Sequence, residues 1–256
     1  MELTFIGTGS GKTSLNRFHT SLLITEKDHN LLIDTGDGIS KALLSSSVNV
    51  RSIDSILISH THADHFSGIT SLLTQMKIER RIEPLNILIH ASFSDFLKKF
   101  INISFLFRES IGFELNIIEY NFDKSFNLEK DLEILPKQNS HIQNKDILTN
   151  YNWLNFVSSS FLIRNNSLNI FYTADIASRN DLFLFNEFSV DYMITEATHI
   201  DLSEIVEAVK FINPKECYLV HINDEELLKN KIVKLSADNK YTLKLTYDGM
   251  RVILPK

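Results

Sequence analysis

Eight histidine and aspartate side chains along this chain form a candidate set of ligands for divalent metal ions. Three imidazoles and one carboxylate fall within six residues, His60-Thr61-His62-Ala63-Asp64-His65. The other four stand apart in the sequence: Asp34, His141, Asp175 and His221. Imidazole nitrogens and carboxylate oxygens together suit zinc and similar divalent ions. A single histidine carries little information, but four donors at the spacing i, i+2, i+4, i+5 predict a metal site.

Short apolar strands are expected to position these donors. Residues 52–59 form an apolar run before the His-rich motif, and the apolar spacing of residues 66–76 predicts a helix after it. The remaining candidate ligands also follow apolar runs: Asp34, Asp175 and His221. His90 follows such a run too, but nothing else supports it as a ligand. Because α/β sheets present ligands at the carboxyl ends of their strands, we expect one common site.

This set of residues, in this order, resembles the metallo-β-lactamase-fold hydrolases over nearly all of the 256 residues. The resemblance implies the α/β class and a four-layer αββα sandwich, formed by a single domain of residues 1–256. It also implies two divalent ions, the first held by three histidines: His60, His62 and His141. The second ion would be held by three other side chains, with Asp175 bridging both ions: Asp64, His65 and His221. Zinc is the favoured metal, and manganese fits the same donors.

Two further segments resemble the ribonuclease Z-like phosphodiesterase branch of these hydrolases, namely residues 4–11 and Glu196-Ala197-Thr198-His199. His199 lies 22 residues before His221. In that branch an accessory histidine precedes the last metal-binding histidine by a similar spacing and is thought to assist the leaving group. The resemblance implies hydrolysis by a metal-bridging hydroxide. It implies catalytic roles for Asp64, Glu196 and His199. It also implies that Asp34 orients the ligands.

The chain also departs from ribonuclease Z. The tRNA-binding arm of that enzyme lies between the equivalents of His141 and Asp175, which are only 34 positions apart here, and a predicted hairpin fills residues 160–175. Thr195 stands where that enzyme usually has a histidine. The chain resembles the armless relatives, which are cyclic-phosphate phosphodiesterases of phosphonate metabolism and phage nucleases that destroy cyclic-nucleotide alarm signals. We therefore expect small or cyclic phosphodiesters as substrates, with cyclic nucleotides favoured.

The charge balance agrees with a small substrate. The chain has 26 Lys and Arg against 32 Asp and Glu, a formal net charge of −6. Proteins that depend on many phosphate contacts are usually basic, so extended nucleic acid is the less favoured partner.

Three alternatives stay open: a tRNA 3′-end endonuclease of the ribonuclease Z type, a lactone or thioester hydrolase, and a non-catalytic scaffold. The retained ligand set opposes the scaffold, and the missing arm opposes the endonuclease.

Composition predicts one α/β domain. Hydrophobic residues make up 43% of the chain, and eight Gly and four Pro leave no evident linker. The single cysteine, Cys217, excludes a disulfide within the chain. The chain opens with a strand rather than a signal peptide, and no apolar stretch reaches the roughly 18 residues of a membrane span. We expect no membrane partner and a cytoplasmic location.

Aromatic residues gather in two segments. Residues 92–107 are predicted to be a helix whose five phenylalanines suit a dimer interface or a wall beside the active site. Together with the phosphodiesterase resemblance, this segment predicts a homodimer. Residues 151–156 belong to an aromatic loop over 142–157 that suits either stacking on a base or packing on the protein itself. Residues 202–212 form a predicted helix with Ser203 as its cap.

Overall fold

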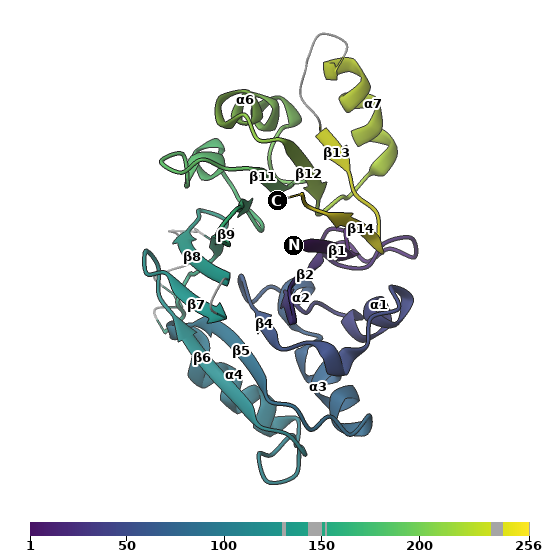
Figure 1. Ribbon diagram of the computed structural model, residues 1–256, viewed down its shortest axis with the longest axis vertical. Helices are drawn as coiled ribbons and strands as arrows, with labels where there is room; N and C mark the ends of the chain where they lie inside the picture. The colour runs from purple at the N-terminus through teal and green to yellow at the C-terminus, as the bar shows by residue number, and fades with distance from the viewer. Residues whose placement is uncertain (130–131, 143–149, 152, 237–242, 256) are drawn as a thin grey trace. The chain divides into compact units, whose positions relative to one another are not determined.

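The computed structural model describes residues 1–129, 132–142, 150–151, 153–236 and 243–255 (Figure 1). The chain folds into two compact units. The N-terminal unit comprises residues 1–121 with residues 247–256, and the second unit comprises residues 122–246. Each unit contains one seven-stranded sheet of its own. The prediction of a single domain over residues 1–256 stays a prediction.

The sheet of the N-terminal unit has the order β14-β1-β2-β3-β4-β5-β6. The first three pairings are antiparallel and the last three are parallel. Its strands are Glu2–Gly7 (β1), Ser21–Glu26 (β2), His29–Ile33 (β3), Ser55–Leu57 (β4), Leu85–His90 (β5), Leu115–Tyr120 (β6) and Met250–Ile253 (β14). The two ends of the chain lie side by side in β1 and β14. Parallel pairing from β3 to β5 brings the carboxyl ends of these strands to one edge, where the His-rich motif begins.

Helices of the N-terminal unit follow its parallel strands: Ile39–Ser45 (α1), Ala63–Phe66 (α2), Ile69–Ile78 (α3) and Ser94–Ile103 (α4), with 3₁₀ turns at Val50–Ser52 (η1) and Ala91–Phe93 (η2). One buried apolar cluster joins α1, α3 and α4 to the sheet. In α3 the core positions are Ile69, Leu72, Leu73 and Met76. This spacing of three and four residues is the one predicted for an amphipathic helix.

The sheet of the second unit has the order β13-β12-β11-β10-β9-β8-β7. Here β10 to β13 pair in parallel, whereas β7 to β10 pair antiparallel. Its strands are Phe126–Glu129 (β7), Leu132–Gln138 (β8), Ser159–Arg164 (β9), Asn169–Tyr172 (β10), Tyr192–Glu196 (β11), Glu216–Val220 (β12) and Leu243–Leu245 (β13). The helices Leu202–Ile212 (α6) and Glu225–Ser236 (α7) and the 3₁₀ turn Arg179–Phe183 (η3) complete it. A second apolar cluster packs α6 and η3 on this sheet.

Three sequence expectations need correction or restriction. The helix predicted over 92–107 covers only Ser94–Ile103, because Phe105 adopts φ 59° and ends it. The amides of Phe105 and Leu106 bond back to the carbonyls of Asn102 and Ile101, which is the Schellman arrangement usually built with glycine. Helix α6 starts at Leu202 with Asp201, not Ser203, as its N-cap.

Much of the aromatic loop expected over residues 142–157 falls outside the described residues. Tyr151 and Trp153 are described, and both side chains are exposed. Within the described part of the chain, no helix has the length and apolar character needed to cross a bilayer.

Arg81 is the largest fully buried side chain of the N-terminal unit. Its guanidinium donates to the carbonyl oxygens of Glu83 at 2.8 Å, Arg51 at 2.6 Å and Pro84 at 2.6 Å. Burial lowers the pKa of Arg81, and the carboxylates of Asp54 and Glu83 oppose that shift. Because a buried cation must be hydrogen-bonded, this residue ties three loop carbonyls together at the end of α3.

We predict that Arg81→Lys lowers the free energy of unfolding by about 2–4 kcal/mol, because one ammonium group cannot reach all three carbonyls that the planar fork serves. Urea unfolding monitored by circular dichroism measures the change. Arg80→Lys is the matched control, since Arg80 is the exposed neighbour, and its effect should stay within about 0.5 kcal/mol. Equal stability of the two variants would refute a structural role for Arg81.

Candidate metal centre

The His-rich motif of the N-terminal unit follows β4 and extends into α2. His60 and His65 are buried, at 1% and 0% exposure. The ring of His60 lies 4.7 Å from that of His62 and 4.2 Å from that of His65, centroid to centroid. The Asp64 carboxylate approaches the His65 ring, with Oδ2 3.4 Å from Nε2. The four donors of the motif therefore lie together in space.

Asp34 lies behind the motif and organises it. Its fully buried carboxylate accepts hydrogen bonds from the Ser59 amide at 2.8 Å and the Ser59 hydroxyl at 2.7 Å. Its Oδ2 also lies 2.7 Å from Nδ1 of His65. A carboxylate that accepts from Nδ1 fixes the ring and its tautomer, so Nε2 would be the atom that binds a metal. These contacts are those expected of a ligand-orienting residue.

Two glycines of the N-terminal unit allow close packing around Asp64. A Cβ at Gly36 would lie 1.9 Å from the Asp64 carbonyl oxygen, and one at Gly11 would lie 2.9 Å from its Oδ2. The loop before β2 therefore lies directly against a proposed ligand.

In the second unit, His141, Asp175 and His221 lie together. Oδ2 of Asp175 is 3.6 Å from Nε2 of His141 and 3.1 Å from Nε2 of His221. Asp175 follows β10, and His221 follows β12, as the apolar runs predicted. Ligand atoms of His141, Asp175 and His199 all lie within 4.8 Å of one another.

His199 joins this group from the turn after β11. Its ring centroid is 4.9 Å from that of His141 and 5.2 Å from that of His221. Glu196 is fully buried beneath the turn: its Oε2 accepts from the amides of Thr198 at 2.6 Å and His199 at 2.8 Å. Its Oε1 lies 3.3 Å from Nδ1 of His199. Glu196 thus contacts His199 through both backbone and ring.

Left-handed backbone conformations occur where the strands deliver these residues. Asp34 follows β3 with φ 63°, Ala174 precedes Asp175 with φ 50°, and His221 follows β12 with φ 55°. Such values cost on the order of 1–3 kcal/mol for a residue with a side chain and persist where surrounding contacts enforce them. At His221 the Thr198 hydroxyl, which donates to its carbonyl, is one such contact.

The donors in each unit fit divalent metal ions by their chemistry. They are imidazoles and carboxylates, buried or half-buried except for the exposed His62, and their clustering without a cation would place acidic groups in a poorly solvated setting. His90 stays apart from these groups, as the sequence suggested: its Nδ1 accepts from the Ser92 amide, and burial lowers its pKa. The assignment of ligands to two ions stays a prediction.

Cys217 lies fully buried in β12, where burial raises the pKa of its thiol.

Known proteins share this fold and part of this sequence. The structure of the metallo-β-lactamase-fold protein YhfI from Bacillus subtilis matches with a TM-score of 0.78 and 19% identity, covering 98% of both chains. That of human tRNase Z, short form (ELAC1), matches with a TM-score of 0.75 and 19% identity over the whole of both chains. The predicted α/β class and metallo-β-lactamase fold are therefore confirmed.

Sequence comparison identifies the branch. Ribonuclease Z from Aeropyrum pernix is 32% identical over 120 residues, which are 46% of this chain and 38% of that protein. The chain thus matches well under half the length of this curated relative. The family model described as "Anti-Pycsar protein Apyc1" matches residues 1–240. The chain therefore belongs to the Apyc1 family of metallo-β-lactamase-fold proteins, within the predicted ribonuclease Z-like group.

Proposed function

We propose that this protein is a metal-dependent phosphodiesterase that hydrolyses small or cyclic phosphodiesters, with cyclic nucleotides as the favoured class. The observation that carries the proposal is the position of His199 beside His141 and His221, held by the buried carboxylate of Glu196. The departing alkoxide of a phosphodiester needs a proton, and an oriented imidazole supplies one. A thiolate leaves without this help, so the arrangement favours phosphodiesters over thioesters.

The proposed ligands of two divalent ions are the donors grouped in the two units: His60, His62, Asp64, His65, His141, Asp175 and His221. Bound ions of this kind lower the pKa of water and take up charge that develops on phosphoryl oxygens. Zinc is the favoured metal, and manganese fits the same donors. Asp34 orients His65 through the hydrogen bond at Nδ1.

Three residues carry the proton chemistry in this proposal. Asp64, in the first turn of α2, would hold or accept the proton of the attacking water. His199 donates a proton to the departing oxygen or stabilises its charge. Glu196 takes part through His199, because its two oxygens contact the turn amides and the imidazole Nδ1.

The comparisons support the phosphodiester class and leave the individual substrate to experiment. The curated relative is named Ribonuclease Z. The family description names an anti-Pycsar protein, that is, a protein that counteracts Pycsar. The phage nucleases that the sequence resembles likewise counteract a signal, since they destroy cyclic-nucleotide alarm signals. The short segment between His141 and Asp175 and the net charge of −6 support a small substrate over folded RNA. A cytoplasmic location remains part of the proposal.

The metal-loaded protein should hydrolyse 2′,3′- or 3′,5′-cyclic nucleotides or cyclic dinucleotides with a higher kcat/KM than it shows for precursor tRNA. Direct competition between labelled substrates measures this preference, with a lactone and a thioester included in the panel. Preferred cleavage of precursor tRNA at its 3′ end would instead establish the ribonuclease Z activity. Turnover of the lactone or thioester alone would refute the phosphodiesterase.

We predict different roles for His199 and the ligands. The wild type should hold two divalent ions per chain, and His62→Ala and Asp175→Ala should lose metal. His199→Ala should keep both ions, while its kcat on an unactivated diester falls by about 10²–10⁴-fold. Elemental analysis and steady-state kinetics measure the two properties, and His90→Ala serves as the histidine control. A p-nitrophenyl ester is a poor test because its leaving group needs little protonation. If His199→Ala kept wild-type turnover of the unactivated diester, the proposed leaving-group role of His199 would be wrong.

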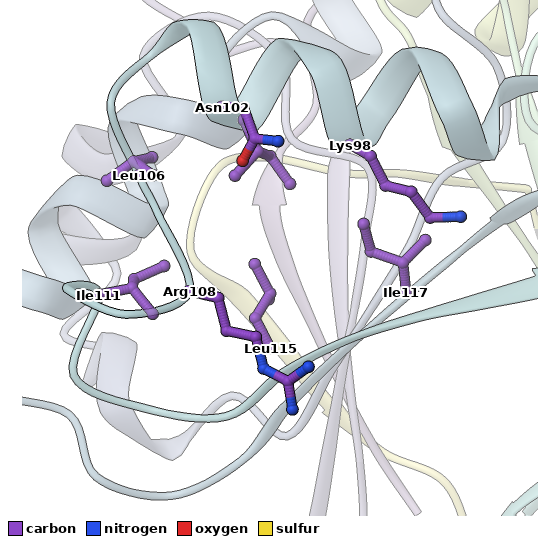
Figure 2. Close-up of a pocket in the computed structure, with 8 residues that line it drawn as sticks. Lys98, Asn102, Leu106, Arg108, Ile111, Leu115 and Ile117 are labelled. Carbon is purple, nitrogen blue, oxygen red and sulfur yellow. The ribbon is translucent and has the colours of Figure 1, made fainter.

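The homodimer is also part of the proposal, and one face of the N-terminal unit suits it. Between α4 and β6 lies a largely apolar groove of about 370 Å³ lined by Lys98, Ile101, Asn102, Leu106, Arg108, Ile111, Leu115 and Ile117 (Figure 2). Large apolar side chains beside it are exposed, among them Ile103 at 74% and Phe105 at 75%. Strand β6 is the edge of its sheet. Clustered apolar exposure of this kind marks interaction surfaces.

The double variant Ile103→Lys/Phe105→Lys should be monomeric under conditions in which the wild type is a dimer. Burying two ammonium groups in an apolar interface is unfavourable, whereas lysine at the end of α4 suits the helix dipole and preserves folding. Light scattering after size-exclusion chromatography measures the mass. Leu44→Lys, at an exposed apolar position of α1, is the control and should remain dimeric. A wild-type monomer at micromolar concentration would refute the dimer, and a dimeric double variant would refute this face.

A further inference from the structure

Asp181 in η3 is a buried carboxylate outside the proposed ligand set. It is 5% exposed. Its Oδ1 accepts from the Ser140 amide at 3.1 Å. Its Oδ2 accepts from the amides of Ala177 at 3.2 Å and Ser178 at 3.1 Å, and from the hydroxyls of Ser140 and Ser178. The contacts with Ser178 form the capping box that begins η3, whereas the two bonds from Ser140 come from outside this turn and need a separate explanation.

The donors to Asp181 come from two separate segments, and each segment carries a proposed ligand. Ser140 directly precedes His141, whereas Ala177 and Ser178 follow Asp175 by two and three residues. Neither segment belongs to a helix or strand at these positions. The Asp181 carboxylate therefore fastens the His141 segment to the Asp175 segment, where regular secondary structure does not.

Asn139 holds the same histidine from the strand side. Its Oδ1 accepts from the His141 amide at 3.1 Å. Its Nδ2 donates to the Ser160 hydroxyl at 3.0 Å and to the Thr173 carbonyl at 3.3 Å, which ties it to β9 and to the end of β10. The backbone of His141 is thus restrained on both sides, by Asn139 at its own amide and by Asp181 at the residue before it.

We propose that Asp181 is a positioning residue that sets the separation of His141 and Asp175 before metal binds. The inference rests on the proposed metal site, and it assigns Asp181 no contact with metal or substrate. Charged acceptors make shorter and stronger hydrogen bonds than neutral ones, so the carboxylate, rather than a polar side chain of equal size, is what holds the two segments. Removing the charge should loosen His141 relative to Asp175 and weaken metal binding.

The test is Asp181→Asn, which keeps the shape but places an amide nitrogen against backbone donors. Zn²⁺ affinity, measured by competition with a chromophoric chelator, should fall about 10–100-fold, as for other residues that orient ligands. Turnover measured at saturating Zn²⁺ should recover, because the site forms once metal enforces it. Ser140→Ala should give part of this loss alone and little further loss in the Asp181→Asn background.

Asp191→Asn is the matched control. Asp191 also accepts a backbone amide, that of Asn169 at 2.9 Å, and pairs with Lys215 at 3.0 Å, but it lies just before β11, away from the strand ends that carry ligands. Its variant should lose stability while keeping wild-type Zn²⁺ affinity. Unchanged affinity in Asp181→Asn, or equal losses in both variants, overturns the positioning role alone. A wild type that binds no divalent ion overturns the proposed function and this inference together.

Discussion

A buried carboxylate must be surrounded by hydrogen-bond donors, and this requirement shapes the loops of both units. Asp34 draws Ser59 and His65 toward itself in the N-terminal unit. Glu196 gathers the amides that form the turn bearing His199. In each case the acid faces donors from a loop, so the geometry of the loop depends on the hydrogen bonds that the carboxylate accepts.

The same requirement explains how strained backbone survives at the strand ends. Asp34 and His221 adopt left-handed conformations although both carry side chains. The contacts that hold them come from neighbouring segments: Ser59 bonds the Asp34 carboxylate, and Thr198 donates to the His221 carbonyl. A sharp turn at the end of a strand exposes the next side chain at the sheet edge. Rigid strands, together with buried acids whose hydrogen bonds are made, therefore hold polar side chains at the ends of apolar runs.

Much of this could be predicted from the sequence, and the part that could not has a physical reason. Apolar runs ending in Asp34, Asp175 or His221 predicted the strands that these residues follow, because burial and period are local properties. The early end of α4 escaped prediction, since its left-handed residue is Phe105 rather than glycine. Asp181 and Asn139 also escaped, because their contacts are hydrogen bonds with residues 41 and 34 positions away along the chain. Hydrogen bonds of that range leave no periodic trace.

The burial of Cys217 has a separate consequence. The chain contains one thiol, fully buried near the start of β12, the strand that His221 follows. Because only an exposed thiolate reacts, alkylating reagents will not modify the native protein until β12 separates from its neighbours. The rate of modification therefore reports the opening of one defined strand, without any engineered label. Cys217 is therefore an intrinsic probe of local unfolding in the strand that precedes a proposed ligand.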